Sequence, residues 1–455
     1  MKILLIIPAS NTNANLYDSL LNRLCSIWPP VTLRQLEAIT PSKHEVELVD
    51  ENYEQINFTK NYDLVGITYF TATAYRAYKI ADRFREKEVK VVLGGYHASA
   101  MPNEAIEHAD AVVIGEAENT WKEVLKDAEN RSLKSFYSSN APSNMNKVPQ
   151  PTLTKIPSII KMGGIEATRG CPFGCEFCAL SNIRFGRIYR KKSIEKVVDE
   201  IKSIPYKYFA FYDGSLTVDL EYTKELFRKI KPLNKKFAAF GHANMIRDEE
   251  FLKIANEAGC IGWDIGFESI YQTTINQLRK NSNIVKKYKQ VVEKLHDYNM
   301  GVIGSFAFGF DDHTRAVFKD TFEAVQHWEI DSVGISILTP LPGTKLFDRL
   351  EKEGRILTKD WSKYDLYNVV FQPKKMHPQE LYDGTAQFVS DYYTPKHLIS
   401  RLLGNIKNLG LISSQPLNYH LLSSRVIYKT VFNQRIIKNP TLKRQVITNK
   451  LLQIE

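Results

Sequence analysis

Short apolar runs alternate with helical patterns over the first 130 residues of the chain. Five runs rich in β-branched residues predict buried strands, at residues 3–7, 45–49, 64–69, 89–93 and 111–114. Between the third and fourth runs, apolar residues from Ala74 to Phe84 follow the i, i+3, i+4, i+7 spacing of one buried helix face. This alternation predicts an α/β fold with a doubly wound, Rossmann-like parallel sheet over residues 1–135.

Sheets of this kind bind ligands beyond the carboxyl ends of their strands. In this chain those ends carry Thr71 after the third strand, Gly94 and Gly95 after the fourth, and Gly115 and Glu116 after the fifth. Glycine at such positions lets the backbone approach a ligand closely. We expect the three loops to converge on one crevice.

A second alternation follows residues 136–160, which are rich in Ser, Asn and Pro and predict a linker. Six further strands are predicted, at residues 165–168, 207–212, 236–240, 261–267, 302–308 and 332–338. The helices between them carry end signals, such as Asp248 as an N-cap and Gly259 as a helix end. Six βα units predict a partial (β/α)6 TIM-like barrel over residues 161–350, followed by a helical extension over residues 351–455.

Positive charge is concentrated in this extension. From Lys396 to the last residue there are ten Lys or Arg and one acid, which accounts for +9 of the net charge of +10. The rest of the chain is nearly neutral, so nucleic-acid binding gains no support. Apolar residues at Leu398, Leu402, Leu403 and Ile406 give the extension one apolar helical face. Two interpretations stay open: peripheral contact with an anionic membrane surface, which would favour a lipid-like substrate, or an arm packed on the barrel.

Cysteine usage and hydropathy indicate where the protein works. Five cysteines in 455 residues cannot form a disulfide scaffold, and three of them fall within eight positions. No apolar run approaches the roughly 18 residues of a membrane span, and the N-terminus lacks a signal-peptide pattern. We expect a cytoplasmic protein, with peripheral attachment to the inner membrane surface as the alternative localisation.

The three clustered cysteines are Cys171, Cys175 and Cys178, at the carboxyl end of the first predicted barrel strand. A closed tetrahedral zinc site needs a fourth donor, whereas an iron–sulfur cube can be held by three thiolates and keep one iron open. The spacing therefore favours an iron–sulfur cluster over a zinc knuckle completed by a distant histidine. An iron without a cysteine ligand can bind a reactant, so such a cluster suits catalysis.

This C-x3-C-x2-C motif, with the aromatic Phe177 before its last cysteine, resembles the radical S-adenosylmethionine (SAM) superfamily. In that family a 4Fe–4S cluster held by the three cysteines binds SAM and cleaves it to a 5′-deoxyadenosyl radical. The resemblance implies that Cys171, Cys175 and Cys178 are the cluster ligands and that Phe177 lies beside the cofactor.

The carboxyl ends of later strands also resemble cofactor-facing segments of this superfamily. The resemblance implies catalytic roles for Asp213 and Glu268. It implies SAM contacts from six residues: Gly241, His242, Gly266, Glu268, Pro340 and Pro342. An N-cap role for Asp213 and a surface position for Glu268 are the alternatives.

The N-terminal half resembles the cobalamin-binding domain that precedes the barrel in one branch of the superfamily, on residues 92–97 and 114–118. The resemblance implies cobalamin at the loops that carry Thr71, Gly94, Gly95, Gly115 and Glu116. Many such domains supply a cobalt-ligating histidine from D-x-H-x-x-G after the first strand, whereas residues 8–13 here read Pro-Ala-Ser-Asn-Thr-Asn. We therefore expect base-off cobalamin without a lower axial histidine. His97 is not expected to be a ligand.

Three enzyme classes are compatible with parts of this pattern. A cobalamin-dependent radical SAM methyltransferase acting on an unactivated carbon is the leading hypothesis, and an oxidative cyclase or other redox enzyme of the same architecture is the alternative. A methylthiotransferase acting on RNA needs three further cysteines, and only Cys25 and Cys260 remain. The expected partners are a small-molecule or lipid-like substrate and a reductant protein such as flavodoxin or ferredoxin.

Overall fold

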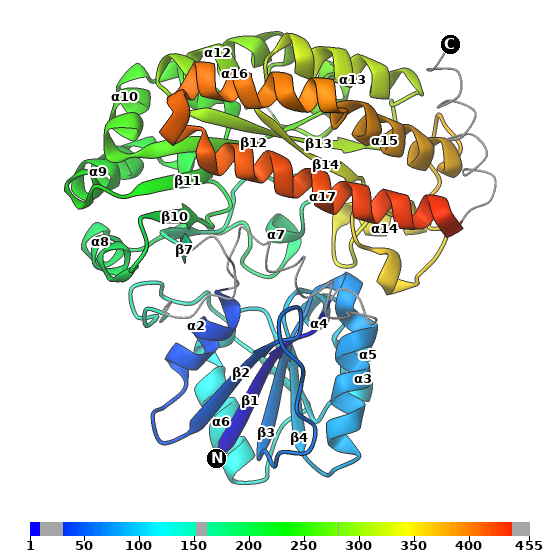
Figure 1. Cartoon of the computed structure of the whole chain (residues 1–455). Coiled ribbons are helices and arrows are strands. Elements are labelled where there is room, and N and C mark those ends of the chain that lie inside the picture. Colours follow the sequence, from blue (N-terminus) through cyan, green and yellow to red (C-terminus); the bar gives the residue numbers. More distant parts are fainter. Residues whose placement is uncertain (10–30, 152–161, 281, 439–455) are drawn as a thin grey trace.

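The computed structural model describes residues 1–9, 31–151, 162–280 and 282–438. Its first domain is a six-stranded parallel sheet in the order β2-β1-β3-β4-β5-β6. The strands are β1 (Lys2–Ile7), β2 (Glu45–Asp50), β3 (Leu64–Thr68), β4 (Lys90–Gly94), β5 (Ala111–Ile114) and β6 (Phe136–Ser138). Figure 1 shows this domain in blue to cyan, with its strands running up toward the rest of the molecule. The predicted doubly wound sheet is confirmed.

Helices cover both faces of this sheet. The helices α2 (Thr32–Ile39) and α6 (Trp121–Glu129) pack on one face, and α3 (Ala74–Arg85), α4 (Tyr96–Ala100) and α5 (Pro102–Ala105) lie on the other. The predicted apolar face of α3 is buried throughout. One difference from the prediction is β6, which lies in the predicted linker. Tyr137 is its single buried side chain, so the segment is too short for a periodic signal.

The second sheet has the strand order β14-β13-β12-β11-β10-β7, and all neighbouring strands are parallel. Its strands are β7 (Met162–Ile165), β10 (Tyr208–Phe211), β11 (Lys236–Gly241), β12 (Cys260–Glu268), β13 (Gly301–Phe308) and β14 (Ser332–Ile337). The outer helices are α8 (Ile194–Ser203), α9 (Leu220–Ile230), α10 (Glu249–Ala258), α12 (Tyr288–Asp297) and α13 (Ala316–His327). This is the predicted partial barrel, with Asp248 capping α10 and Gly259 ending it in a left-handed conformation.

The inner face of the second sheet is less buried than its outer face along β11, β12 and β14. Outward residues such as Trp263 and Phe267 are buried against the helices, whereas alternate inward residues of these three strands keep some accessible surface. On β13, Ile303 is buried against the C-terminal helices. The inward residues are mostly small: Ala238, Phe240, Asp264, Gly266, Ser305, Gly334 and Ser336. We call this partly exposed inner surface of the barrel the lumen.

The C-terminal extension completes the barrel. It contains α14 (Lys345–Lys352), α15 (Pro378–Tyr392), α16 (Pro395–Ser413) and α17 (Gln415–Lys438). Figure 1 shows α17 crossing β14, which is one of the two edge strands of the sheet. The Ile335 amide of β14 donates a 2.7 Å hydrogen bond to the Tyr428 hydroxyl of α17. Over residues 395–438, the extension therefore packs on the barrel, as the second interpretation predicts, but Leu403 of the predicted apolar face is exposed.

Among the residues with assigned positions, none of the helices is both long enough and apolar enough to cross a membrane.

Candidate active site

The three clustered cysteines lie in one loop between the short antiparallel strands β8 (Thr168–Arg169) and β9 (Arg190–Lys191). We call residues 170–189 the cysteine loop. The side chain of Asn182 donates to the backbone oxygen of Cys178 at 2.7 Å and to that of Cys175 at 3.1 Å. Gly170 has a φ of 91°, and a Cβ there would lie 2.3 Å from the Ile188 oxygen. The loop thus needs glycine at its base and holds its own backbone in place.

All three cysteines of this loop are partly exposed, whereas Cys260 is buried in β12. Burial raises the pKa of Cys175 to about 11 and also raises that of Cys171, so both thiols are protonated at neutral pH until a metal displaces the proton. Within the described ranges, no three His, Cys, Asp or Glu side chains lie close enough together to hold one metal ion. Three accessible thiols on one loop fit a cluster with an open iron better than a closed zinc site. Cys25 lies outside the described residues.

Two aromatic residues of the cysteine loop face the barrel. Phe177 packs edge-on against Phe310, with ring centroids 6.0 Å apart. The ring of Phe173 lies 4.5 Å from that of His242, which shares a 2.5 Å hydrogen bond with Ser215. Burial, helped by the positive charge of Lys280, lowers the pKa of His242 to about 3. His242 is therefore a neutral hydrogen-bonding group beside the cysteine loop.

An ion pair stands at the end of β12. Lys280 Nζ lies 2.5 Å from Glu268 Oε1 and donates to the Gly266 oxygen at 2.7 Å. A Cβ at Gly266 would lie 2.3 Å from the Glu268 carboxylate, so glycine is required for the pair to form. Both charges act on the pKa of Cys175, which places the pair beside the cysteine loop. Sequence reasoning missed Lys280, because it follows α11 (Gln272–Gln277) in a loop that carries no motif.

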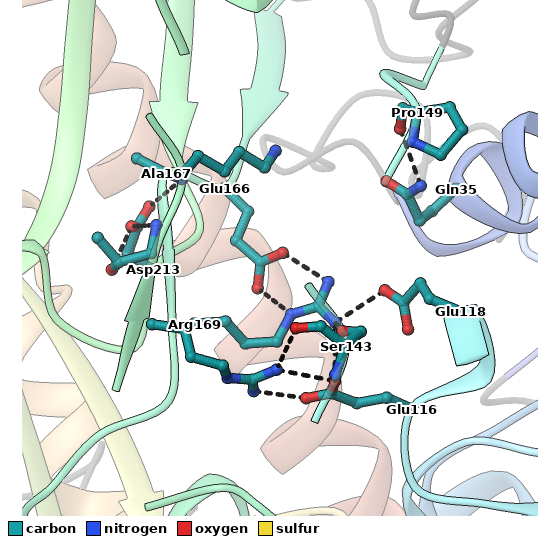
Figure 2. Close-up of polar contacts among 12 residues, drawn as sticks. Gln35, Glu116, Glu118, Ser143, Pro149, Glu166, Ala167, Arg169 and Asp213 are labelled. Carbon is teal, nitrogen blue, oxygen red and sulfur yellow. Dashed lines mark hydrogen bonds and ion pairs between the residues drawn. The ribbon is translucent and has the colours of Figure 1, made fainter. Parts of the chain in front are cut away.

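Asp213 has a different position from the predicted catalytic one. Its buried carboxylate accepts hydrogen bonds from the amides of Ala167 and Thr168 and, at 2.5 Å, from the Thr168 hydroxyl (Figure 2). It therefore fixes the chain where β7 leads into the cysteine loop. This contact is neither an N-cap nor an exposed catalytic position.

Gly241 also does not lie where a SAM contact was predicted. The two-residue alternation of β11 turns Phe240 inward and Gly241 outward, where a Cβ would lie 2.8 Å from Trp263. Gly241 thus allows close packing of the barrel wall. Pro340 and Pro342 follow β14, and the Pro342 oxygen accepts a 2.8 Å hydrogen bond from Tyr96 of the first domain.

A cavity of about 400 Å³ lies between the two domains. Gly94, Gly95, Gly115 and Glu116 line it from the first sheet, as predicted. The opposite wall is formed by the end of β7 and the base of the cysteine loop. A glycine-rich floor that faces the cysteine loop fits a large flat cofactor between the domains. Sequence reasoning missed the side wall, which α2 and α6 provide.

Thr71 does not line this cavity. It is buried, and its hydroxyl lies 3.2 Å from His97 Nδ1. His97 is itself fully buried, with its ring 5.3 Å from that of Trp361. Thr71 therefore packs inside the first domain and does not contact the cavity, in contrast to its predicted role as a cofactor contact. The 8–13 segment, which lacks the histidine motif, lies mostly outside the described residues.

Comparison with known proteins agrees with this geometry. The family model of the radical SAM superfamily matches residues 165–325, that of the B12 binding domain matches residues 19–125, and a domain of unknown function (DUF4070) matches residues 344–444. The chain is 32% identical to the bacteriochlorophyllide d C-8(2)-methyltransferase of Chlorobaculum tepidum, over 86% of this chain and 91% of that one. It is 29% identical to the C-12(1)-methyltransferase of the same organism, over 90% of each chain.

The fold is shared with the solved structure of the radical SAM methyltransferase TsrM from Kitasatospora setae with cobalamin and a [4Fe-4S] cluster bound. The TM-score is 0.66 at 14% identity, over 94% of this chain and 99% of that one. The architecture of a cobalamin domain joined to a radical SAM barrel is thus shared along nearly the whole chain. The chain belongs to the radical SAM superfamily, in its cobalamin-dependent methyltransferase branch, and is an enzyme whose cofactors are a 4Fe–4S cluster, SAM and cobalamin.

Proposed function

We propose that the enzyme transfers a methyl group to an unactivated carbon of a cyclic tetrapyrrole. The observation that carries this proposal is the similarity, along 86% and 90% of the chain, to two methyltransferases named for bacteriochlorophyllide d. When bound, the three cofactors supply hydrogen abstraction from carbon and a donated methyl group. The protein itself binds the cofactors and the substrate and orients them toward one another.

In this proposal Cys171, Cys175 and Cys178 hold the cluster. Lys280 and Glu268 have the charges that suit the carboxylate and ammonium groups of SAM, and they lie beside the cysteine loop. Gly94, Gly95 and Gly115 let the cobalamin ring approach the first sheet closely. His242, neutral and fixed by Ser215, orients Phe173 of the cysteine loop.

The lumen is the proposed substrate chamber. Most of its partly exposed residues have small side chains, and Phe240 adds an aromatic ring on which a flat molecule could stack. The carboxyl group of Asp264 lies on this surface, where it accepts a 2.8 Å hydrogen bond from the Ser305 hydroxyl, and burial raises its pKa to about 6. A buried carboxyl is costly unless hydrogen-bond donors meet it. Asp264 therefore suits a polar substituent that donates a hydrogen bond and orients the ring.

The test is an anaerobic assay with cluster and cobalamin loaded, bacteriochlorophyllide d as the substrate, SAM labelled in its methyl group, and reduced flavodoxin or ferredoxin as the electron donor. The proposal expects the labelled methyl group in the tetrapyrrole product, together with 5′-deoxyadenosine. An oxidised or cyclised product without the label would instead establish the cyclase alternative. SAM cleavage with no change in the tetrapyrrole would reject this substrate class.

We also propose peripheral contact with the inner membrane surface, where such pigments and lipid-like substrates partition. Among the described residues, half of the exposed large apolar side chains lie on α16 and α17: Ile399, Leu403, Leu411, Leu422, Val426 and Ile427. Between Asp391 and Glu455 the sequence contains no acidic residue. An apolar surface within a basic, acid-free segment suits an anionic bilayer.

A further inference from the structure

The ribbon that closes the cysteine loop has two like charges side by side. Arg169 of β8 and Arg190 of β9 are directly opposite each other in the antiparallel register. Like charges in directly opposed positions destabilise a strand pair. The ribbon is only two residues long on each side, so its pairing needs support from outside.

That support comes from the first domain. Glu116, which follows β5, accepts from Arg190 through both carboxylate oxygens, at 2.5 and 2.9 Å. Its Oε2 also lies 3.6 Å from Arg169 Nη1. The amide and hydroxyl of Ser143 donate to the same oxygen at 2.8 and 2.5 Å. One carboxylate of the cobalamin domain thus lies between the two arginines of the barrel domain.

Arg169 is held from both domains as well. Its guanidinium forms a two-pronged contact with Glu166 at 2.8 and 2.9 Å, and Nη1 donates to Glu118 at 2.7 Å (Figure 2). The side chains of Glu116, Glu118 and Arg169 are 13%, 11% and 19% exposed. Screening by salt is weak at this depth, and losing one partner would leave a poorly solvated charge.

The network is also placed next to both cofactor loops in sequence. Arg169 is two residues before Cys171, and Glu116 directly follows Gly115, whose backbone lines the interdomain cavity. Any shift of the first domain therefore displaces the base of the cysteine loop.

We infer that Glu116, Arg169 and Arg190 form an interdomain clasp, through which the cobalamin domain holds the cysteine loop in the conformation that retains the cluster. The three are positioning residues, and the inference rests on the proposed roles of the loop and the cavity. Its consequence is that the two cofactor sites are coupled: opening the clasp weakens cluster retention and cobalamin binding together.

The test compares wild type with Glu116→Gln, which removes the charge and keeps the shape. Two readouts are independent of turnover: the rate at which a chelator removes iron from the anaerobic holoenzyme, and the Kd for cobalamin by optical titration. We expect Glu116→Gln to lose iron at least tenfold faster and to bind cobalamin at least tenfold more weakly. Glu118→Gln, which loses one contact to Arg169, should change both less. Glu257→Gln, which removes an exposed partner of Lys231, should change neither.

A double-mutant cycle shows whether the effect passes through the ribbon. Arg190→Gln combined with Glu116→Gln should release iron no faster than Glu116→Gln alone, because the partners act as one unit. If Glu116→Gln does not fold, Arg190→Lys, which keeps the charge and gives up the two-pronged contact, should show the same two changes in smaller degree.

Iron release and cobalamin Kd both within twofold of wild type in Glu116→Gln would overturn the clasp. A change in only one of them would also overturn it, because coupling requires both. If the wild type makes no methylated tetrapyrrole and the clasp variants still change both readouts, the proposed substrate fails and the clasp stands.

Discussion

At the scale of single residues, Lys280 brings a positive charge to the point where the cysteine loop meets the barrel. It touches Glu268 and the Gly266 oxygen, and its charge acts on the pKa values of His242 and Cys175. Glu268 adopts a left-handed φ of 64° at a register shift between β12 and β13. A non-glycine residue in that conformation is often kept for function, and here it directs the carboxylate toward Lys280.

Replacing Lys280 tests its proposed role toward SAM. Lys280→Met should weaken SAM binding about 10- to 100-fold, because a hydrogen bond to a charged group contributes about 1.5–3 kcal/mol. Iron content should stay at the wild-type level. Equilibrium binding of SAM to the reconstituted protein measures the change, with the exposed Lys286→Met as the control. Unchanged SAM affinity would exclude Lys280 from the binding site.

The cysteines give a second test at this scale. Cys175→Ala should abolish both the visible absorbance of the cluster and SAM cleavage, because two thiolates cannot retain the open-iron cluster. Cys260→Ala should keep both and lose about 1 kcal/mol of stability, since Cys260 is a small buried core residue of β12. If Cys175→Ala still cleaves SAM, Cys175 is not a ligand of the cluster.

The residues that could be predicted from the sequence are those with a local signal. The cysteine spacing and the glycines at strand ends are motifs within a few residues, and they lie where they were expected. Lys280 and the clasp could not be predicted, because their partners are fixed by contacts such as Arg190 with Glu116, 74 residues apart. Asp213 and Gly241 were assigned by resemblance, and their contacts follow from strand alternation and loop geometry instead.

At the scale of elements, α17 covers the exposed edge of β14. An open edge leaves backbone amides unpaired, and Tyr428 accepts one of them at Ile335. Leu421, Tyr428 and Phe432 also belong to the main core of the barrel. Deleting residues 395–455 would therefore damage the barrel, so the surface role of these helices needs point substitutions.

Tyr428→Phe should destabilise the fold by about 1–2 kcal/mol, because it leaves the buried Ile335 amide without an acceptor. Tyr75→Phe, which removes a hydrogen bond to the Lys359 oxygen at the surface, should cost less. Denaturant unfolding followed by circular dichroism compares the two. Equal losses would show that Tyr428 contributes nothing particular to the strand edge.

The exposed apolar residues of α16 and α17 allow a test of membrane contact that leaves the core intact. Leu403→Ser, Leu411→Ser and Ile427→Ser together should reduce flotation with anionic liposomes, because all three side chains are exposed. Wild-type flotation should fall as salt rises, since each basic residue near the surface contributes about 1 kcal/mol. Leu357→Ser, an exposed apolar residue elsewhere, is the control. Wild-type flotation by the triple variant would reject this surface as the contact.

At the scale of the whole molecule, the two domains are joined by contacts that no local sequence pattern predicts. Trp361 donates to Glu104 across 257 residues of chain, and the core of the first domain includes Phe347, Tyr364 and Val370 from beyond the barrel. Each βα unit could be predicted because its periodicity is local. The interface could not, because its residues are scattered and become neighbours only after both domains fold.

Because both domains line the cavity, cobalamin should stabilise the molecule as one unit. At a free concentration 100 times its Kd the ligand adds about 2.7 kcal/mol, which thermal unfolding in the dark with and without cobalamin will show as a higher Tm. Gly94→Leu should lose this ligand-dependent rise while keeping its own Tm near the wild-type value. A Cβ at Gly94 would have only ordinary contacts with Val113, at 3.8 Å, so the added side chain would extend into the cavity.

Gly95 is a poorer choice for the same experiment, because its φ is 94° and a Cβ would lie 2.7 Å from the Tyr69 amide nitrogen. A variant there would be strained with or without ligand. Gly404→Ala, which adds a methyl group in open space on α16, is the matched control and should keep the full rise. If Gly94→Leu also keeps the full rise, cobalamin does not occupy the cavity beside β4, and the glycine-rich strand ends serve only the packing of the domains.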